Sequence, residues 1–193
     1  MAATSPALSF PPGVLLAAQG AGLGLRAALF DVDGVLTDGR IYVGPDGETF
    51  KAFSTQDGHG LKLLARGGIV PVVVSGRDSP ALRRRLADLG IAHSACGVEN
   101  KLAAAEPLLA ALGVGWDAVA AIGDDWPDLP LLQRAAFSCA PADAHAEVRS
   151  RVHHVTRAGG GHGAAREFCD LLLVAAGRYA ALLESRPVTL DGA

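Results

Sequence analysis

Residues 27–39 read AALFDVDGVLTDG, and the rest of the 193-residue chain can be understood from them. The four apolar residues that open this stretch predict a short buried strand. Asp31 and Asp33 follow the strand, and they project to the same side because side chains alternate along an extended backbone. Open α/β folds bind ligands at the carboxyl edge of a parallel sheet. The stretch therefore predicts a ligand site at the end of a first, central strand.

Two carboxylates at this spacing repel each other unless a cation or a shared proton intervenes. Mg²⁺ is suited to such a place, because it accepts one or two carboxylates together with phosphate oxygens and water. A solvated acidic loop is the alternative, and for a bare pair of aspartates it is the usual explanation. The buried strand before the pair and Gly34 after it favour a metal site.

Strand-like and helix-like patterns alternate along the rest of the chain. We predict further strands at residues 69–74, 92–96, 119–122, 137–139 and 154–155, and helices that cover residues 57–66, 79–89, 100–112, 127–135, the vicinity of 148 and 164–176. Asp57 is expected to cap the first of these helices. This alternation predicts an α/β fold, a doubly wound parallel sheet with helices on both faces.

Three segments depart from the alternation. Residues 40–53 predict a β-hairpin, because the turn sequence GPDG separates two short runs rich in β-branched and aromatic residues. Residues 159–163, GGGHG, predict a flexible loop. Residues 1–24 are expected to form a loose N-terminal extension with one helical turn, residues 25–176 the domain, and residues 177–193 a C-terminal tail.

Composition excludes several classes of protein. The net charge is −3, and the absence of clustered Lys and Arg argues against nucleic-acid binding. No apolar run approaches the roughly 20 residues of a membrane span, and no basic start precedes an apolar stretch as in a signal peptide. Three widely spaced cysteines fit a reducing compartment rather than a disulfide framework. We therefore expect a cytoplasmic protein.

Polar residues also follow the other predicted strands, which end at the same edge of the sheet. Ser75 and Gly76 offer a hydroxyl and an accessible amide to a phosphate oxygen. Lys101 offers a compact cation, and Asp124 and Asp125 offer carboxylates. Each has an ordinary explanation when it is taken alone, such as a helix cap, a solvated lysine or an acidic turn. Their order along the chain favours one joint site.

That order resembles the motifs of the haloacid dehalogenase superfamily, which appear here as DVDG, VVVSGR, the Lys101 region and GDDWPD. The resemblance implies phosphoryl transfer through an aspartyl phosphate. Asp31 would be the nucleophile and Asp33 the general acid and base. Ser75 and Lys101 would hold the transferring group. Mg²⁺ would be bound by Asp31, the backbone carbonyl of Asp33, and Asp124.

From about residue 25 to residue 174 the chain is similar to the 3-deoxy-D-manno-octulosonate 8-phosphate phosphatase family. The similarity rests on LFDVDGVLTDGRIYVGPDGETFKAF, DGHGLKLL and VTRAGGGHGAAREFCDLLL, among other strings. It implies Mg²⁺-dependent hydrolysis of that sugar acid phosphate for lipopolysaccharide precursor synthesis. The substrate contacts that it implies are Asp33, Ser54, Thr55, Gln56, Asp57, Gly58, Lys62, Gly76, Arg77, Arg85, Lys101 and Asp125.

Three positions depart from the family pattern. Gln56 and Lys62 stand where the family usually has arginine, and Ser75 stands where it usually has threonine. The first two changes remove bidentate recognition of carboxylates, so the identity of the sugar acid stays open. The alternative substrate is a nine-carbon nonulosonate 9-phosphate. A phospho-receiver and an inactive scaffold are also considered, but the intact D-x-D-G motif and its partners disfavour both.

The predicted hairpin occupies the place where many superfamily members carry a cap domain. So small a hairpin is marginally stable alone. It would also expose the apolar side chains of Ile41, Tyr42, Val43, Phe50 and Phe53. Closed symmetry would bury this surface against neighbouring copies. The resemblance implies a homotetramer with a central barrel of hairpins, and the tail after Ala176 could reach a neighbouring site.

Overall fold

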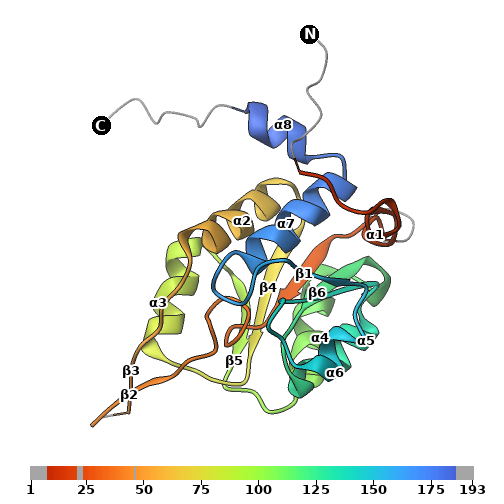
Figure 1. Cartoon of the computed structure of the whole chain (residues 1–193). Coiled ribbons are helices and arrows are strands. Elements are labelled where there is room, and N and C mark those ends of the chain that lie inside the picture. Colours follow the sequence, from red (N-terminus) through yellow and green to blue (C-terminus); the bar gives the residue numbers. More distant parts are fainter. Residues whose placement is uncertain (1–7, 21–23, 46, 186–193) are drawn as a thin grey trace.

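A computed structural model describes residues 8–20, 24–45 and 47–185. Its centre is a parallel sheet of six strands in the order β5-β4-β1-β6-β7-β8 (Figure 1). The strands are β1 (Ala27–Phe30), β4 (Val70–Ser75), β5 (His93–Cys96), β6 (Val119–Ile122), β7 (Phe137–Ala140) and β8 (His154–Val155). Every predicted strand is present, and the prediction of an α/β doubly wound sheet is confirmed. The strand order reverses direction between β1 and β6, which places the topological switch point there.

Helices cover both faces of the sheet (Figure 1). One face carries α1 (Pro12–Ala17), α2 (Thr55–Arg66), α3 (Pro80–Leu89) and α7 (Ala164–Ala175), and the other carries α4 (Lys101–Leu112), α5 (Leu129–Arg134) and α6 (Ala146–Arg149). Alternate residues of β1 serve the two faces: Ala28 and Phe30 pack on the α2 and α7 side, and Ala27 and Leu29 pack on the α4 side. The strand is therefore buried on both sides, as its continuous apolar sequence predicts.

Two short 3₁₀ helices, η1 (Trp116–Ala118) and η2 (Trp126–Asp128), flank β6. The N-terminal cap of α2 differs from the prediction. The hydroxyl of Ser54 caps this helix by accepting a hydrogen bond from the backbone N–H of Asp57 at 3.3 Å. The carboxylate of Asp57 instead accepts from the backbone N–H groups of Gly163 at 3.2 Å and Arg166 at 2.7 Å. Asp57 thus caps α7, whose N-cap residue Gly163 lies 106 residues later in the chain.

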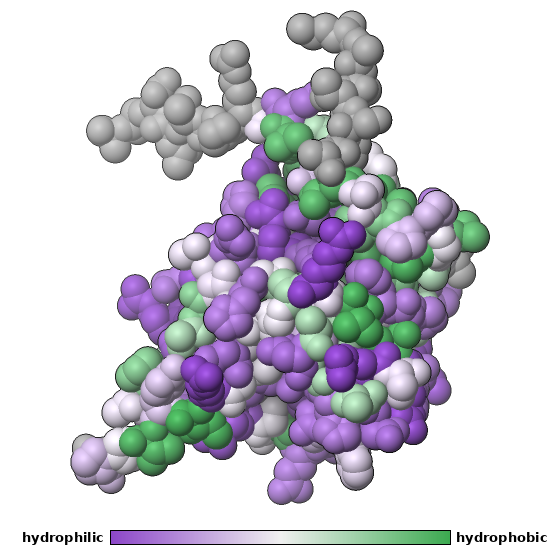
Figure 2. Space-filling view, viewed as in Figure 1, coloured by the Kyte–Doolittle hydropathy of each residue, from purple (hydrophilic) through white to green (hydrophobic). Residues whose placement is uncertain are grey.

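The predicted hairpin is present and forms a separate antiparallel pair, β2 (Tyr42–Gly44) and β3 (Gly47–Phe50). It projects from the body of the molecule at the lower left of Figure 1. Figure 2 shows hydrophobic side chains on this projection, where Val43 is 74% exposed and Phe50 is 53% exposed. The rings of Tyr42 and Phe50 stack with their centroids 4.4 Å apart. Ile41, Val43 and Phe50 are therefore exposed as the sequence predicts, whereas Tyr42 and Phe53 are half-buried and Phe53 packs against the core.

The glycine-rich loop at residues 159–163 was expected to be flexible, but it packs tightly against the first motif. The backbone N–H of Gly161 donates to the carbonyl of Val35 at 3.0 Å. Gly160 lies so close to Gly34 that a Cβ at Gly160 would overlap the carbonyl oxygen of Gly34. The glycines are needed here for close approach rather than for mobility.

Both ends of the described chain carry helices on the α7 side. Helix α1 lies where one helical turn was expected, and its neighbour Ala18 is buried. The tail contains an additional helix that was not predicted, α8 (Tyr179–Glu184), and Leu182 packs it against the core. Residues 1–7, 21–23 and 186–193 lie outside the described part of the chain. No helix among the described residues is long and apolar enough to span a membrane.

Candidate active site

The polar strand ends meet at the carboxyl edge of the sheet, next to the switch point. Asp31 follows β1, Ser75 ends β4, Lys101 begins α4, and Asp124 lies two residues beyond β6. Asp31, Ser75 and Lys101 are each at least 93% buried. The ammonium of Lys101 donates to Oδ1 of Asp31 at 2.6 Å. The structure thus brings together residues that the sequence placed on four separate segments.

A third carboxylate, which sequence reasoning missed, completes this cluster. Oxygen atoms of Asp31, Asp124 and Asp128 all lie within 4.8 Å of one another. Oδ1 of Asp128 accepts from Lys101 at 2.6 Å, and its Oδ2 accepts from the backbone N–H groups of Asp124 and Asp125 at 3.1 and 3.3 Å. The sequence does contain a pattern that predicts backbone contacts for Asp128. Asp125 and Asp128 have the spacing of a capping box, and η2 adopts that arrangement.

The electrostatics of the cluster fit a divalent cation. Three carboxylates and one ammonium carry a formal charge of −2 in a buried place. Burial raises the pKa of Asp31 to about 7, with a further rise from the charge of Asp128 and an opposing effect of Lys101. Burial, and then the charges of Asp31 and Asp128, raise the pKa of Asp124 to about 8. Without a metal ion, protons are therefore retained by Asp31 and Asp124 and neutralise part of the excess negative charge. A divalent cation would neutralise the same charge.

The ammonium of Lys101 stays charged among these carboxylates. Burial disfavours the charged form, but the charges of Asp31 and Asp128 and their hydrogen bonds outweigh burial and raise the pKa of Lys101. A buried lysine with two short carboxylate contacts is a fixed cation. It is positioned to neutralise negative charge that develops beside Asp31.

Gly34 lets the first motif pass close to the loop after β6 that carries Asp124. Its φ angle is +91°, in the region that L side chains rarely adopt. A Cβ at this position would also overlap the carboxylate of Asp124. The glycine after the D-x-D pair is therefore required by both backbone conformation and space.

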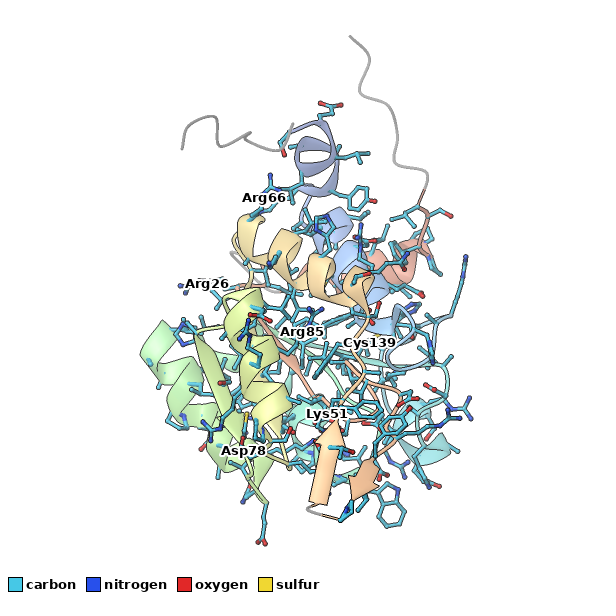
Figure 3. The ribbon with its side chains drawn as sticks, turned by 90° about the vertical axis from the view of Figure 1, so that its left-hand side faces the viewer. Arg26, Lys51, Arg66, Asp78, Arg85 and Cys139 are labelled. Atoms are coloured by element: carbon cyan, nitrogen blue, oxygen red, sulfur yellow. The ribbon has the colours of Figure 1, made fainter. Side chains whose placement is uncertain are left out.

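Asp33 lies beside the cluster and faces the hairpin. Its Oδ1 is 2.5 Å from the ammonium of Lys51, whose side chain is only 1% exposed. The same ammonium is 3.4 Å from Glu48, and Glu48 accepts from the guanidinium of Arg77 at 3.2 Å. Figure 3 shows Lys51 at the base of the hairpin. Sequence reasoning identified Asp33 and Arg77 but missed Lys51 and Glu48, which connect them.

The other expected substrate contacts fall into two groups. Arg85 donates to the backbone carbonyl of Ser54 at 3.0 Å, lies over the ring of Phe53 at 5.6 Å, and packs against Gly58, so it belongs with the start of α2. The remaining members are exposed: Thr55, Gln56, Lys62, Gly76 and Asp125. Of these, Asp125 is hydrogen-bonded to the carboxylate cluster, through its backbone N–H and Oδ2 of Asp128. Ser75 turns its hydroxyl to the backbone N–H of Arg77, from which it accepts at 3.2 Å.

Comparisons with known proteins agree with this geometry. Residues 97–168 match the family model of haloacid dehalogenase-like hydrolases. The chain is 44% identical over 154 residues to 3-deoxy-D-manno-octulosonate 8-phosphate phosphatase of Escherichia coli K12, which covers 80% of this chain and 82% of the relative.

Two solved structures extend the similarity to the fold. The corresponding phosphatase of Yersinia pestis is 40% identical, with a TM-score of 0.82 and coverage of 87% of this chain and 89% of that one. The Moraxella catarrhalis enzyme was solved with magnesium ion, phosphate ion and KDO; it is 36% identical, with a TM-score of 0.82 and coverage of 88% and 95%. The chain belongs to the 3-deoxy-D-manno-octulosonate 8-phosphate phosphatase family of the haloacid dehalogenase superfamily.

Proposed function

We propose that this protein hydrolyses 3-deoxy-D-manno-octulosonate 8-phosphate to the free sugar acid and phosphate. The observation that carries the proposal is the buried cluster of Asp31, Lys101, Asp124 and Asp128 at the switch point, with Asp33 two residues beyond Asp31. The relatives named above, at 36–44% identity over most of the chain, support this substrate.

In the proposed reaction a carboxylate oxygen of Asp31 attacks phosphorus, and the bond between phosphorus and the sugar oxygen breaks. Asp33 gives its proton to that leaving oxygen. Asp33 then takes a proton from a water molecule, whose oxygen attacks the aspartyl phosphate, regenerates Asp31 and releases phosphate. Lys101 holds Asp31 through the 2.6 Å hydrogen bond and offers positive charge to the phosphoryl oxygens, to which Ser75 and Gly76 add a hydroxyl and an amide.

The cofactor in this proposal is Mg²⁺. Asp31, Asp124 and the backbone carbonyl of Asp33 would hold it, and Asp128 would support it through Asp124 and Lys101. When bound, the ion screens the repulsion between the nucleophile and the phosphoryl group. The excess negative charge of the cluster and the raised pKa values of Asp31 and Asp124 support a divalent cation in this position.

Recognition of the sugar acid is assigned to the rim of the site. Arg77 and Arg85 supply guanidinium groups, and the segment from Ser54 to Gly58 supplies the start of α2. Both oxygens of Asp57 are already engaged with the start of α7, so its proposed contribution is to hold this segment in place. Lys62 and Asp125 complete the proposed set, and both are exposed.

The proposal includes a homotetramer in which hairpins of neighbouring copies meet. Its support is the exposed apolar surface of β2 and β3, which includes Ile41, Val43 and Phe50. A cytoplasmic location is also proposed. The three cysteines Cys96, Cys139 and Cys169 are free, which suits a reducing compartment.

A second candidate substrate is a nine-carbon nonulosonate 9-phosphate. Gln56 and Lys62, which replace the usual arginines, favour a changed sugar-binding rim. The test is a phosphate-release screen with both sugar acid phosphates and several simple sugar phosphates, with and without Mg²⁺. The proposed function requires the highest kcat/KM for the eight-carbon substrate and dependence on Mg²⁺. A preference for the nine-carbon acid would select the second candidate.

A further inference from the structure

Lys51 has no part in the reaction just described, although its ammonium lies 2.5 Å from Asp33. Its side chain is 1% exposed, which makes it one of the most buried charged groups among the described residues. Lysine is almost never buried so completely unless it is paired. The position therefore needs an explanation in terms of the groups that it contacts.

Lys51 belongs to a row of four alternating charges: Arg77, Glu48, Lys51 and Asp33. The distances between successive partners are 3.2, 3.4 and 2.5 Å. Two positive and two negative groups give this row no net charge. It therefore differs from the carboxylate cluster beside it, which has an excess of negative charge, and it is complete without an added ion.

The row connects three segments of the backbone. Glu48 lies in β3, Lys51 directly follows that strand, Arg77 follows β4, and Asp33 follows β1. The base of the hairpin is thereby fixed to the edge of the sheet at the point where Asp33 follows β1. Arg77 is 48% exposed, so the row runs from solvent to the buried ammonium.

We infer that Lys51 is a positioning residue for the proposed reaction, because it fixes the Asp33 carboxyl group where proton transfer to the leaving oxygen takes place. Proton transfer requires the acid to stay within hydrogen-bonding reach of that oxygen. Asp33 lies in a loop and is 20% exposed, and Lys51 is the cation that restrains it. Lys51 acts through Asp33 and exchanges no proton in the step. The inference rests on the proposed function.

The experiment compares two substrates in the full-length Lys51→Met variant. The sugar acid phosphate releases an alkoxide that needs a proton, whereas p-nitrophenyl phosphate releases a phenolate that needs little help. We expect kcat/KM to fall about 30-fold for the sugar acid phosphate and no more than about threefold for p-nitrophenyl phosphate, since positioned general acids contribute about 10²–10⁴-fold. Arg84→Met is the control, because Arg84 forms an exposed ion pair on α3, and it should leave both values unchanged.

Two more variants separate positioning from packing. Removing Lys51 also leaves Oε1 of Glu48 without a cation, while Oε2 keeps its contact with Arg77. A purely structural role would therefore be relieved in the double variant Glu48→Gln/Lys51→Met. We expect the double variant to be as slow on the sugar acid phosphate as Lys51→Met alone. Lys51→Arg keeps the charge and should keep the wild-type ratio between the two substrates.

An equal loss on both substrates, or recovery of activity in the double variant, would overturn the inference. Assays of the wild-type enzyme separate a failure of the proposed substrate from a failure of the role inferred for Lys51. If it releases phosphate from another sugar phosphate but not from the eight-carbon acid, the proposed substrate fails, and the comparison is made with the substrate that it does hydrolyse. If it hydrolyses no phosphoester, the proposed function and the inference fall together.

Discussion

Lys101 and Asp128 are joined by a hydrogen bond of 2.6 Å, the same length as the bond between Lys101 and Asp31. One ammonium therefore bridges the nucleophile proposed here and the carboxylate of Asp128 at the end of η2. Asp128 also accepts hydrogen bonds from the backbone of Asp124 and Asp125. It orients both the lysine and the loop, although it was not recognised from the sequence.

Replacing Asp128 tests this arrangement. Asp128→Asn should lower kcat about 10- to 100-fold and weaken the apparent affinity for Mg²⁺, as is usual when a partner of metal ligands is lost. Steady-state kinetics over a Mg²⁺ titration would measure both effects. Asp117→Asn, at an exposed position in η1, is the control and should match the wild type. Wild-type kinetics in Asp128→Asn would contradict the role assigned here.

Substitutions of the two aspartates of the first motif should block the reaction at different steps. Asp31→Asn should abolish turnover, because an amide is not a nucleophile. Asp33→Asn should keep substrate binding but stop protonation of the leaving group and hydrolysis of the intermediate. Phosphate release measures turnover, and calorimetry with the intact substrate measures binding. Substantial steady-state activity in either variant would exclude the aspartyl-phosphate mechanism.

Removal of divalent cations should abolish phosphatase activity. Activity should vanish in excess chelator and return with Mg²⁺, because the cluster carries excess negative charge without a cation. Ca²⁺ should bind and inhibit, since its looser and higher coordination can engage both oxygens of the attacking carboxylate. The assay is phosphate release after each addition. Full activity in chelator would show that the reaction does not need the metal.

The raised pKa of Asp124 predicts a pH dependence of stability in the metal-free protein. The unfolded chain ionises Asp124 near its ordinary pKa of 3.8, whereas the folded chain holds the proton up to about pH 8. Between these values the folded state binds more protons, so this contribution to stability is lost as pH rises. In chelator, Tm of the wild type should fall relative to Asp124→Asn from pH 5 to pH 8.

The melting temperatures of the wild type and Asp124→Asn are compared with those of a control variant. Asp117→Asn should follow the wild type at every pH, because its side chain is exposed. Differential scanning fluorimetry in matched buffers gives the three melting curves. A gap between the wild type and Asp124→Asn that stays constant over this range would show that Asp124 does not retain its proton.

A charge on the hairpin tests the proposed assembly. Phe50→Glu places a carboxylate within the exposed apolar surface, beside the stacked ring of Tyr42. We expect the proposed tetramer to dissociate. Relative to the wild type, KM should rise more for the sugar acid phosphate than for p-nitrophenyl phosphate. Sedimentation velocity at the assay concentration reports the oligomeric state. A wild-type protein that is monomeric and fully active would refute the assembly.

The sequence predicted the sheet well because its signals are local. Continuous apolar runs and the polar turns after them identify strands such as β4 and β6 without knowledge of the fold. The convergence of Asp31, Lys101 and Asp124 also followed, since parallel strands must end at one edge. Helix α8 was missed because it is only six residues long and has no capping side chain.

The contacts that were missed depend on tertiary structure. Lys51 meets Asp33 only because the hairpin turns the chain back, and nothing in the sequence around Lys51 distinguishes it from a solvated lysine. Asp57 has the position of a helix cap, yet the helix that it caps is α7 rather than its own. Local patterns identify which groups need partners, but the fold decides which partners they find.

The contact between Gly160 and Gly34 also concerns the order in which the protein is synthesised. Translation produces the first motif early, and the loop that packs on it emerges late. A nascent chain that has reached only β7 already contains every proposed catalytic side chain, but the backbone that closes over Val35 is still missing. The backbone contact that closes over the first motif therefore forms only after Gly160 and Gly161 have been synthesised, long after Asp31 and Asp33.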